Sequence, residues 1–172
     1  ESLGASILLV AHAVGGLALT VQSSFGSQNL VGAGPNALAA VTTVVQLVAI
    51  VSVWIWFARG PANSDRMVRG CAAAVCAFVA FGKVFSPQYL IWLIPLAPLV
   101  GGRRGLKATM LLATALVLTQ LWFPARYWVL AHALATPEVM LVFARDVAVV
   151  ALLLVLLIRR RRLIQVARED HL

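Results

Sequence analysis

Charged residues are scarce in this sequence. Only 12% of its 172 residues are charged and only 6 are acidic, whereas about a quarter of a typical soluble domain is charged. The charges lie in short clusters, and the stretches between them run without charge for most of a bilayer thickness. This scarcity excludes an ordinary soluble domain and indicates membrane-spanning segments.

Cysteine is nearly absent as well. The sequence has 2 cysteines, Cys71 and Cys76, and their spacing places them on different faces of a helix, which argues against a disulfide or a metal pair. His12 and His132 each stand alone, with no second ligand at helical spacing. We therefore expect no metal site and no cofactor.

The net charge of +8 does not indicate a nucleic-acid partner, because the basic residues stand between apolar segments and do not form one face. Eleven of the 14 Lys and Arg residues fall in the loops at 59–69 and 103–107 and in the tail from Arg159. Under the positive-inside rule these three places lie on the cytoplasmic side. The run Arg159 to Arg162 should also contact anionic membrane lipids.

These signals predict an all-α fold: a single transmembrane domain over residues 1–172 that forms a polytopic helix bundle. The basic loops require about six passes in a cell membrane, with both ends of this chain in the cytoplasm. The predicted spans cover residues 3–20, 36–57, 70–84, 87–100, 105–123 and 139–158.

Residues 70–100 must hold two passes of about 15 residues each, below the usual length of about 20. Because Pro87 disfavours helix at Ser86, we predict a Pro-broken hairpin that turns at Ser86-Pro87 near the outer membrane surface. Aromatic residues near both predicted surfaces, such as Trp54 and Trp122, agree with this topology.

Lys83 is a cation on the outer side, where cations are disfavoured. It stands in a polar break between two short passes, and Ser86, Gln88 and Tyr89 follow it closely. Irregular backbone within a membrane is tolerated where protein or water satisfies it, so such breaks often mark binding sites. The alternative is a lysine that reaches to outer lipid phosphates beside a plain turn.

The run from Lys83 to Pro95, KVFSPQYLIWLIP, closely resembles a signature of membrane glycosyltransferases of the GT-C superfold, in particular glycosyltransferase family 87. The eukaryotic glycosylphosphatidylinositol mannosyltransferase has a related serine, glutamine and tyrosine segment. Weaker likenesses extend over nearly the whole chain, at Glu1-Ser2-Leu3, Gly26 to Leu30, Thr119 to Pro124 and Arg126-Tyr127-Trp128.

The resemblance implies transfer of a hexose, usually mannose, from a polyprenyl-phosphate sugar to a lipid or glycan acceptor on the outer face. In such enzymes the general base is an acidic residue of the first outer loop, which belongs to an N-terminal half. No acidic residue here matches it, and Glu1 stands directly before an apolar run. We therefore expect a C-terminal portion that binds the donor, needs the missing N-terminal half as its partner and is inactive alone. Its own catalytic residues are unknown.

A polyprenyl-phosphate leaving group gains negative charge as the sugar departs, and a fixed cation in a water-poor site stabilises that charge. Lys83 and Arg126 are the predicted outer-side cations, and a guanidinium is well suited to phosphate. Arg126 can instead anchor the chain at the interface beside Tyr127 and Trp128. The predicted substrate-binding residues are Lys83, Ser86, Gln88, Tyr89, Arg126 and Arg145.

Arg145 and Asp146 lie about 10 Å into the last predicted span. Ionisable residues at that depth are functional candidates, and the alternative is an internal charge pair with neighbouring helices. Because adjacent residues of a helix point to different faces, we expect these two side chains not to pair with each other.

Two other classes of protein remain open. A small transporter or flippase-type protein would bind a polar lipid headgroup or a solute in the same hairpin, but it should show a repeated pair of broken spans, and one broken hairpin is visible. A membrane scaffold without a ligand would not explain the position of Lys83.

Overall fold

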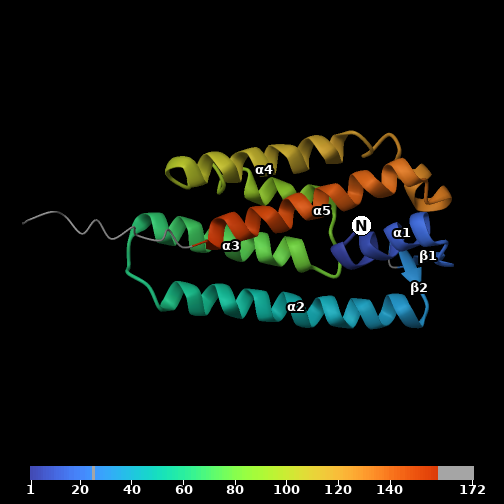
Figure 1. Ribbon diagram of the computed structural model, residues 1–172, viewed down its shortest axis with the longest axis horizontal. Coiled ribbons are helices and arrows are strands. Elements are labelled where there is room, and N and C mark those ends of the chain that lie inside the picture. Colours follow the sequence, from blue (N-terminus) through green and yellow to red (C-terminus); the bar gives the residue numbers. More distant parts are fainter. Residues whose placement is uncertain (25, 159–172) are drawn as a thin grey trace, which may run out of the picture.

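The computed structural model describes residues 1–24 and 26–158. The long helices run side by side along the long axis of the molecule: α2 (Ala33–Ala58), α3 (Ser64–Phe81), α4 (Gly102–Gln120) and α5 (Thr136–Leu157) (Figure 1). A shorter helix, α1 (Leu3–Gly15), packs against α5 and α2. The described chain is therefore mostly helical, as predicted.

The connections between the helices gather at two ends of this bundle (Figure 1). At one end lie the α2–α3 loop, the start of α4 and the end of α5; we call it the basic end, since Arg59, Arg66, Arg69, Arg103 and Arg104 belong to it. The opposite end carries a β-hairpin and residues 121–135, and we call it the hairpin end.

Local sequence explains where several helices begin. The Asn63 side chain caps α3 by accepting a hydrogen bond from the Arg66 amide at 2.9 Å. Pro35 and Pro137 lie in the first turns of α2 and α5, where a proline removes no intrahelical hydrogen bond. Helices α2, α4 and α5 match the predicted spans 36–57, 105–123 and 139–158 to within about three residues, which is the usual uncertainty of helix ends predicted from sequence.

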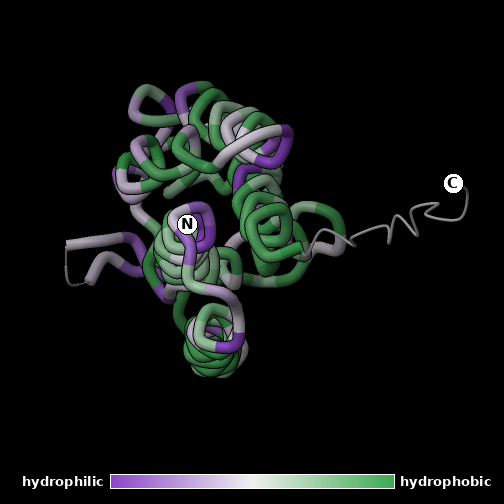
Figure 2. The backbone as a smooth tube through the Cα atoms, turned by 90° about the vertical axis from the view of Figure 1, so that its left-hand side faces the viewer, coloured by the Kyte–Doolittle hydropathy of each residue, from purple (hydrophilic) through white to green (hydrophobic). Residues whose placement is uncertain are grey.

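Two described helices, α2 and α5, are long and apolar enough to cross a membrane, with hydropathies of 2.3 and 2.6. Figure 2 shows α2 as apolar around most of its circumference, and its Val44, Leu47 and Val48 side chains are 59–60% exposed. An apolar surface of this length suits lipid. Because within residues 1–24 and 26–158 only these two helices meet both criteria, the predicted six passes are not supported.

The predicted first span, residues 3–20, is too long. α1 ends at Gly15 because Gly16 adopts a left-handed conformation (φ 68°), and the Gly16 amide bonds to the His12 carbonyl at 2.9 Å. Its 13 residues rise about 20 Å, short of a hydrocarbon core of about 30 Å.

The all-α prediction also fails directly after α1. Strands β1 (Thr20–Ser24) and β2 (Ser27–Val31) form an antiparallel hairpin, mostly in the segment between the predicted spans 3–20 and 36–57. Gly26 supplies a positive φ (73°) in the turn, and the paired segments contain β-branched Val21 and Val31, which favour strands.

Residues 70–100 are not two α-helical passes. α3 starts earlier than the predicted span 70–84 and ends at Phe81, and residues 82–86 are not helical. The predicted span 87–100 is a 3₁₀-helix, η1 (Pro87–Leu93), followed by turns. The predicted break at Ser86-Pro87 is confirmed: Ser86 is extended, with ψ 139°.

This break lies near the middle of the bundle and not at the hairpin end. Gln46, near the centre of α2, donates from Nε2 to the Phe78 carbonyl at 2.8 Å. Figure 1 shows α3 ending well short of the hairpin end. From Arg69, which bonds to the last turn of α5, the helix rises about 18 Å to Phe81, roughly half the length of α2.

Buried apolar residues form two clusters among the described residues. The larger one joins α3, η1, α4 and α5 and contains mostly small side chains from α3, such as Ala73, Cys76 and Ala77. The second lies toward the hairpin end, around Trp122 and Val139, with Leu9 of α1. The small residues of α3 let the helices approach closely, as is common in membrane bundles.

Candidate functional site at the break and the hairpin end

Lys83 lies in the break between α3 and η1, and its side chain is exposed. No ion pair within residues 1–24 and 26–158 includes it. The neighbouring Val84 is 61% exposed. The ammonium group is therefore accessible to an anionic ligand.

The polar residues that follow Lys83 begin η1. The Ser86 carbonyl accepts a hydrogen bond from the Tyr89 amide at 2.9 Å and closes the first 3₁₀ turn. The Tyr89 ring stacks on Trp92, with centroids 4.7 Å apart and ring planes 15° apart, and it packs against the larger core cluster. Gln88 is exposed. Of these three side chains, Gln88 is the most accessible to a ligand shared with Lys83.

Arg145 and Asp146 are buried in the middle of α5, with exposed fractions of 0% and 2%. The prediction that they do not pair is wrong, because Nη2 and Nε of Arg145 donate to Oδ1 of Asp146 at 2.8 and 3.0 Å. The arginine side chain is long enough to turn back along its own helix. Pairing also lowers the cost of holding two charges away from water.

Two aromatic rings that sequence reasoning missed complete the surroundings of Arg145. The guanidinium carbon lies 4.0 Å from the ring centroid of Phe85 and 5.8 Å from that of Trp122. Phe85 belongs to the break, so this cation–π contact joins the break to α5. An aromatic residue beside a polar break was the one sequence signal that could have indicated a role for Phe85. The spacing of residues in the sequence could not show that its partner is Arg145 on α5.

Several polar atoms around Arg145 are buried without a hydrogen-bond partner in the described structure: Nη1 of Arg145, Oδ2 of Asp146, Nε1 of Trp122 and Oε2 of Glu1. Arg145 Nη2 also donates to the Glu1 carbonyl at 2.5 Å. Buried polar atoms are normally satisfied. This polar centre therefore has capacity for further hydrogen bonds.

Arg126 lies at the hairpin end and is paired with an acid. Its Nη1 is 3.3 Å from Oε1 of Glu138, and the side chains are 60% and 5% exposed. Glu138 is in the first turn of α5, where the helix dipole favours an anion. Because one face of the guanidinium remains exposed, Arg126 can contact a ligand without losing Glu138.

Tyr127 follows Arg126 outside the long helices. Burial, and to a smaller extent the Glu1 carboxylate, raises the pKa of the Tyr127 phenol above its ordinary value. The phenol therefore stays protonated at neutral pH and is able to donate a hydrogen bond.

The structure brings only some of the predicted site residues together. Lys83 shares the break with Phe85, which contacts Arg145. Glu138, the partner of Arg126, precedes Arg145 by about 10 Å along α5. Among the described residues, no ion pair or side-chain hydrogen bond joins Arg126 to Lys83 or Arg145. Chemically, the arrangement offers two exposed cations, one at the break and one at the hairpin end.

The part of the chain that the structure describes holds no group of three or more His, Cys, Asp or Glu side chains able to bind a metal ion. The thiols of Cys71 and Cys76 are both free.

Comparison with known proteins gives one match. The family model described as Mannosyltransferase (PIG-M) matches residues 20–166. No curated protein and no solved structure matches the chain. The matched residues include the hairpin, the break, Arg126 and α5.

Proposed function

Because the chain belongs to the mannosyltransferase (PIG-M) family, we propose that it acts in mannosyl transfer from a polyprenyl-phosphate mannose on the outer face of a cell membrane. Family membership makes it a membrane glycosyltransferase. Our proposal adds three points: a particular likeness to glycosyltransferase family 87, a polyprenyl donor, and a donor-binding role for this part of the protein. The family match does not favour the transporter or flippase alternative.

In the proposed reaction an acceptor hydroxyl oxygen forms a bond to C1 of mannose. The bond from C1 to the phosphate oxygen breaks, and polyprenyl phosphate leaves with the electron pair. The hydroxyl proton passes to a base, which the resemblance places in an N-terminal part of the enzyme. The developing charge on the phosphate is where this chain would contribute, because fixed cations stabilise it most in a water-poor site.

The observation that carries this proposal is the free ammonium group of Lys83 at a backbone break near the middle of the bundle. A cation in that position is costly unless an anion or water reaches it. A lipid-linked phosphate supplies such an anion. Gln88 is exposed beside Lys83, and Ser86 is half-buried; both are proposed to assist with hydrogen bonds.

Arg126 and Arg145 contribute differently in this proposal. Arg126 is exposed at the hairpin end and suits a bidentate contact with phosphate. Arg145 is fully buried, and its contacts with Asp146 and Phe85 favour a positioning role that holds the break against α5. Tyr89, whose ring packs on Trp92, favours positioning of η1.

The experiment compares two identical substitutions at exposed lysines. Lys83→Met keeps the apolar stem and removes the charge, and Lys107→Met does the same in α4 near the basic end. A lost charge-assisted hydrogen bond is worth about 1.5–3 kcal/mol, so transfer by Lys83→Met should fall about ten- to a hundredfold. Lys107→Met should transfer mannose at the parental rate. Lys83→Arg should retain part of the activity, because it keeps the charge with a different shape.

Transfer is measured with radiolabelled polyprenyl-phosphate mannose in membranes with matched amounts of inserted protein. If Lys83→Met retains the parental rate, Lys83 does not contact the donor phosphate. If the parental membranes show no transfer from this donor above a strain that lacks the protein, the polyprenyl donor itself is rejected.

We further propose a multi-pass topology with the basic end in the cytoplasm and the hairpin end outside. The clustering of arginines in the α2–α3 loop, the start of α3 and the start of α4 supports it. In this arrangement the half-length elements α1 and η1 lie between the long helices, within the membrane.

A further inference from the structure

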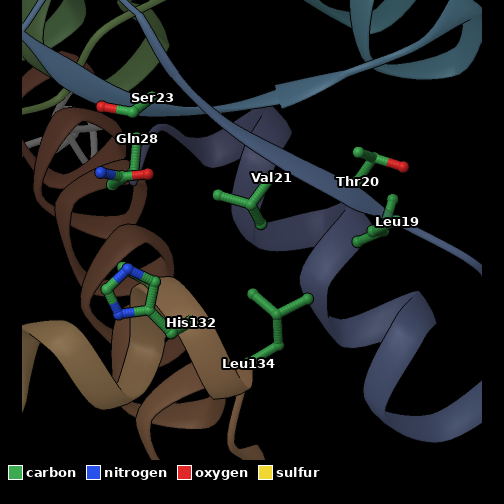
Figure 3. A pocket seen from close by; sticks show the side chains of 8 residues that line it. Leu19, Thr20, Val21, Ser23, Gln28, His132 and Leu134 are labelled. Carbon is green, nitrogen blue, oxygen red and sulfur yellow. The ribbon is translucent and has the colours of Figure 1, made fainter.

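A pocket of about 530 Å³ lies at the hairpin end, between the β-hairpin and residues 131–134. Figure 3 shows its two walls, with Ser23, Gln28 and Val21 on the hairpin side and His132 and Leu134 opposite them. This volume is within the usual range of small-molecule sites, about 300–1,000 Å³. None of the functional residues considered so far lines it.

The register of the strands places three of the lining side chains on one face of the hairpin. Val21 and Ser23 are two residues apart, and Ser23 pairs with Gln28 across the hairpin, so all three are on one face. Gln22 pairs with Asn29 and belongs to the other face. The hairpin thus offers two glutamines in the same small element, one in the pocket wall and one outside it.

The opposite wall has an unusual backbone. The π-helical turn η2 (Val129–Ala133) precedes Leu134, whose φ is positive (47°). The His132 ring stacks on Trp128, with centroids 5.2 Å apart and planes 10° apart. Strained backbone that is held by its surroundings is common at binding sites.

The chemistry of the lining is neutral. Hydroxyl, amide and imidazole groups come from Thr20, Ser23, Gln28 and His132, and apolar surface comes from Leu19, Val21, Ala131 and Leu134. Apart from His132, the lining contains no residue with an ionisable side chain. Among the described residues, the side chains of Ser23, Gln28 and His132 make no hydrogen bond.

Such a lining suits a neutral sugar ring. The hydroxyls of a pyranose can both donate and accept hydrogen bonds, as can the hydroxyl, amide and imidazole groups present here. The C–H faces of the ring need apolar contact, which Val21 and Leu134 provide on opposing walls. The lining contains no lysine or arginine that would hold a phosphate group.

We propose that this pocket binds the neutral hexose ring of the acceptor. The inference rests on the proposed transferase function and adds the place and chemical class of the second substrate. Arg126 comes three residues before η2 in the chain and is at the same end of the bundle. The pocket and Arg126 therefore lie at the same end of the bundle.

The first experiment measures sugar binding without any need for activity. Saturation-transfer NMR follows methyl α-D-mannopyranoside with the protein in lipid nanodiscs. Gln28→Ala, which loses one or two neutral hydrogen bonds, should weaken binding about two- to tenfold. Gln22→Ala is the matched control on the other face of the hairpin and should bind as the parent does. His132→Phe keeps a ring to stack on Trp128 and should weaken binding similarly to Gln28→Ala.

The second experiment assigns the sugar to one substrate. Octyl α-D-mannopyranoside serves as acceptor and polyprenyl-phosphate mannose as donor. Gln28→Ala should raise the KM for the acceptor about two- to tenfold and leave the KM for the donor unchanged. A raised donor KM would instead place the donor mannose in the pocket and overturn the acceptor assignment.

The two proposals can fail separately. Mannoside binding that depends on Gln28, in a protein that transfers no mannose, rejects the transferase proposal and with it the acceptor role, but leaves a sugar site. Normal mannosyl transfer, with Gln28→Ala and Gln22→Ala indistinguishable in binding and in both KM values, rejects the pocket and leaves the transferase.

Discussion

The two ends of the bundle use their arginines in different ways. At the basic end Arg69 and Arg104 donate to the last carbonyls of α5: Arg69 Nη2 to Leu156 at 2.8 Å and Arg104 Nη2 to Ile158 at 2.7 Å. At the hairpin end Arg126 pairs with Glu138 in the first turn of α5 and remains 60% exposed. α5 therefore has cations at its C-terminal end and an acid at its N-terminal end, as its dipole favours.

Some of these cations have a structural role, and others remain available to bind a ligand. At the basic end the arginines satisfy backbone carbonyls that a helix terminus leaves free. At the hairpin end and at the break, Arg126 and Lys83 keep exposed charge. Arg69 and Arg104 thus stabilise the basic end, whereas Arg126 and Lys83 remain accessible to ligands.

The largest effect is expected in thiol labelling of single cysteines placed at the two ends of the bundle, where each cysteine should either react from outside or not react at all. Single cysteines at Ser27 and Ala133, at the hairpin end, should react with an impermeant thiol reagent applied outside intact cells. A cysteine at Asn63, at the basic end, should react only after the membrane is permeabilised. Cys71→Ser and Cys76→Ser provide the background, because both native thiols are free. Reaction of the Asn63 cysteine from outside would invert the proposed topology.

Midway between the two ends, Arg145→Met should cause the largest loss of stability. It leaves the Asp146 carboxylate buried without its partner, which costs about 3–5 kcal/mol in the free energy of unfolding. The double variant with Asp146→Leu should recover most of that loss. Urea unfolding in detergent, followed by circular dichroism, measures both. A double variant no more stable than Arg145→Met would show that the pair does not explain the loss.

Arg69→Met tests the basic end. Removal of the hydrogen bonds from Arg69 to the Leu156 carbonyl at 2.8 and 3.2 Å should lower the free energy of unfolding by about 1.5–3 kcal/mol. Arg59→Met is the control. Arg59 lies at the same end of the bundle, it is exposed, and its side chain makes no hydrogen bond or ion pair with the described residues. The same unfolding assay applies. Equal stabilities of the two variants would argue against a capping role for Arg69.

Arg126→Gln should have the smallest effect on stability, about 0–1 kcal/mol, because the arginine side chain is 60% exposed and a glutamine amide can still donate a hydrogen bond to the buried Glu138 carboxylate. Mannosyl transfer should nevertheless fall, and the exposed Arg103→Gln at the basic end should leave it unchanged. Assays of unfolding and transfer on the same preparations separate the two effects. A stability loss as large as that of Arg69→Met would place Arg126 among the structural arginines.

Sequence reasoning succeeded where the signal was local. Long apolar runs predicted α2, α4 and α5, and the Ser86-Pro87 dipeptide predicted the break. It failed where the outcome depended on a partner. Residues 20–31 form a hairpin because the two strands pair, for example Ser23 with Gln28, and neither strand predicts its partner. The position of the break along the bundle is likewise fixed by a tertiary contact, between Gln46 and Phe78.

The candidate site shows the same division. The sequence by itself determined that Lys83, Arg126 and Arg145 are unusual, because charge in an apolar chain is costly wherever it occurs. Only the tertiary structure decided that Arg145 is paired with Asp146 beneath Phe85, that Lys83 is free, and that the hairpin forms a pocket with His132. The contact of Phe85 with Arg145 and the pocket between the hairpin and His132 each join parts of the chain that are at least 60 residues apart. Packing decides which of these distant side chains meet, and the types and spacings of the residues do not specify it.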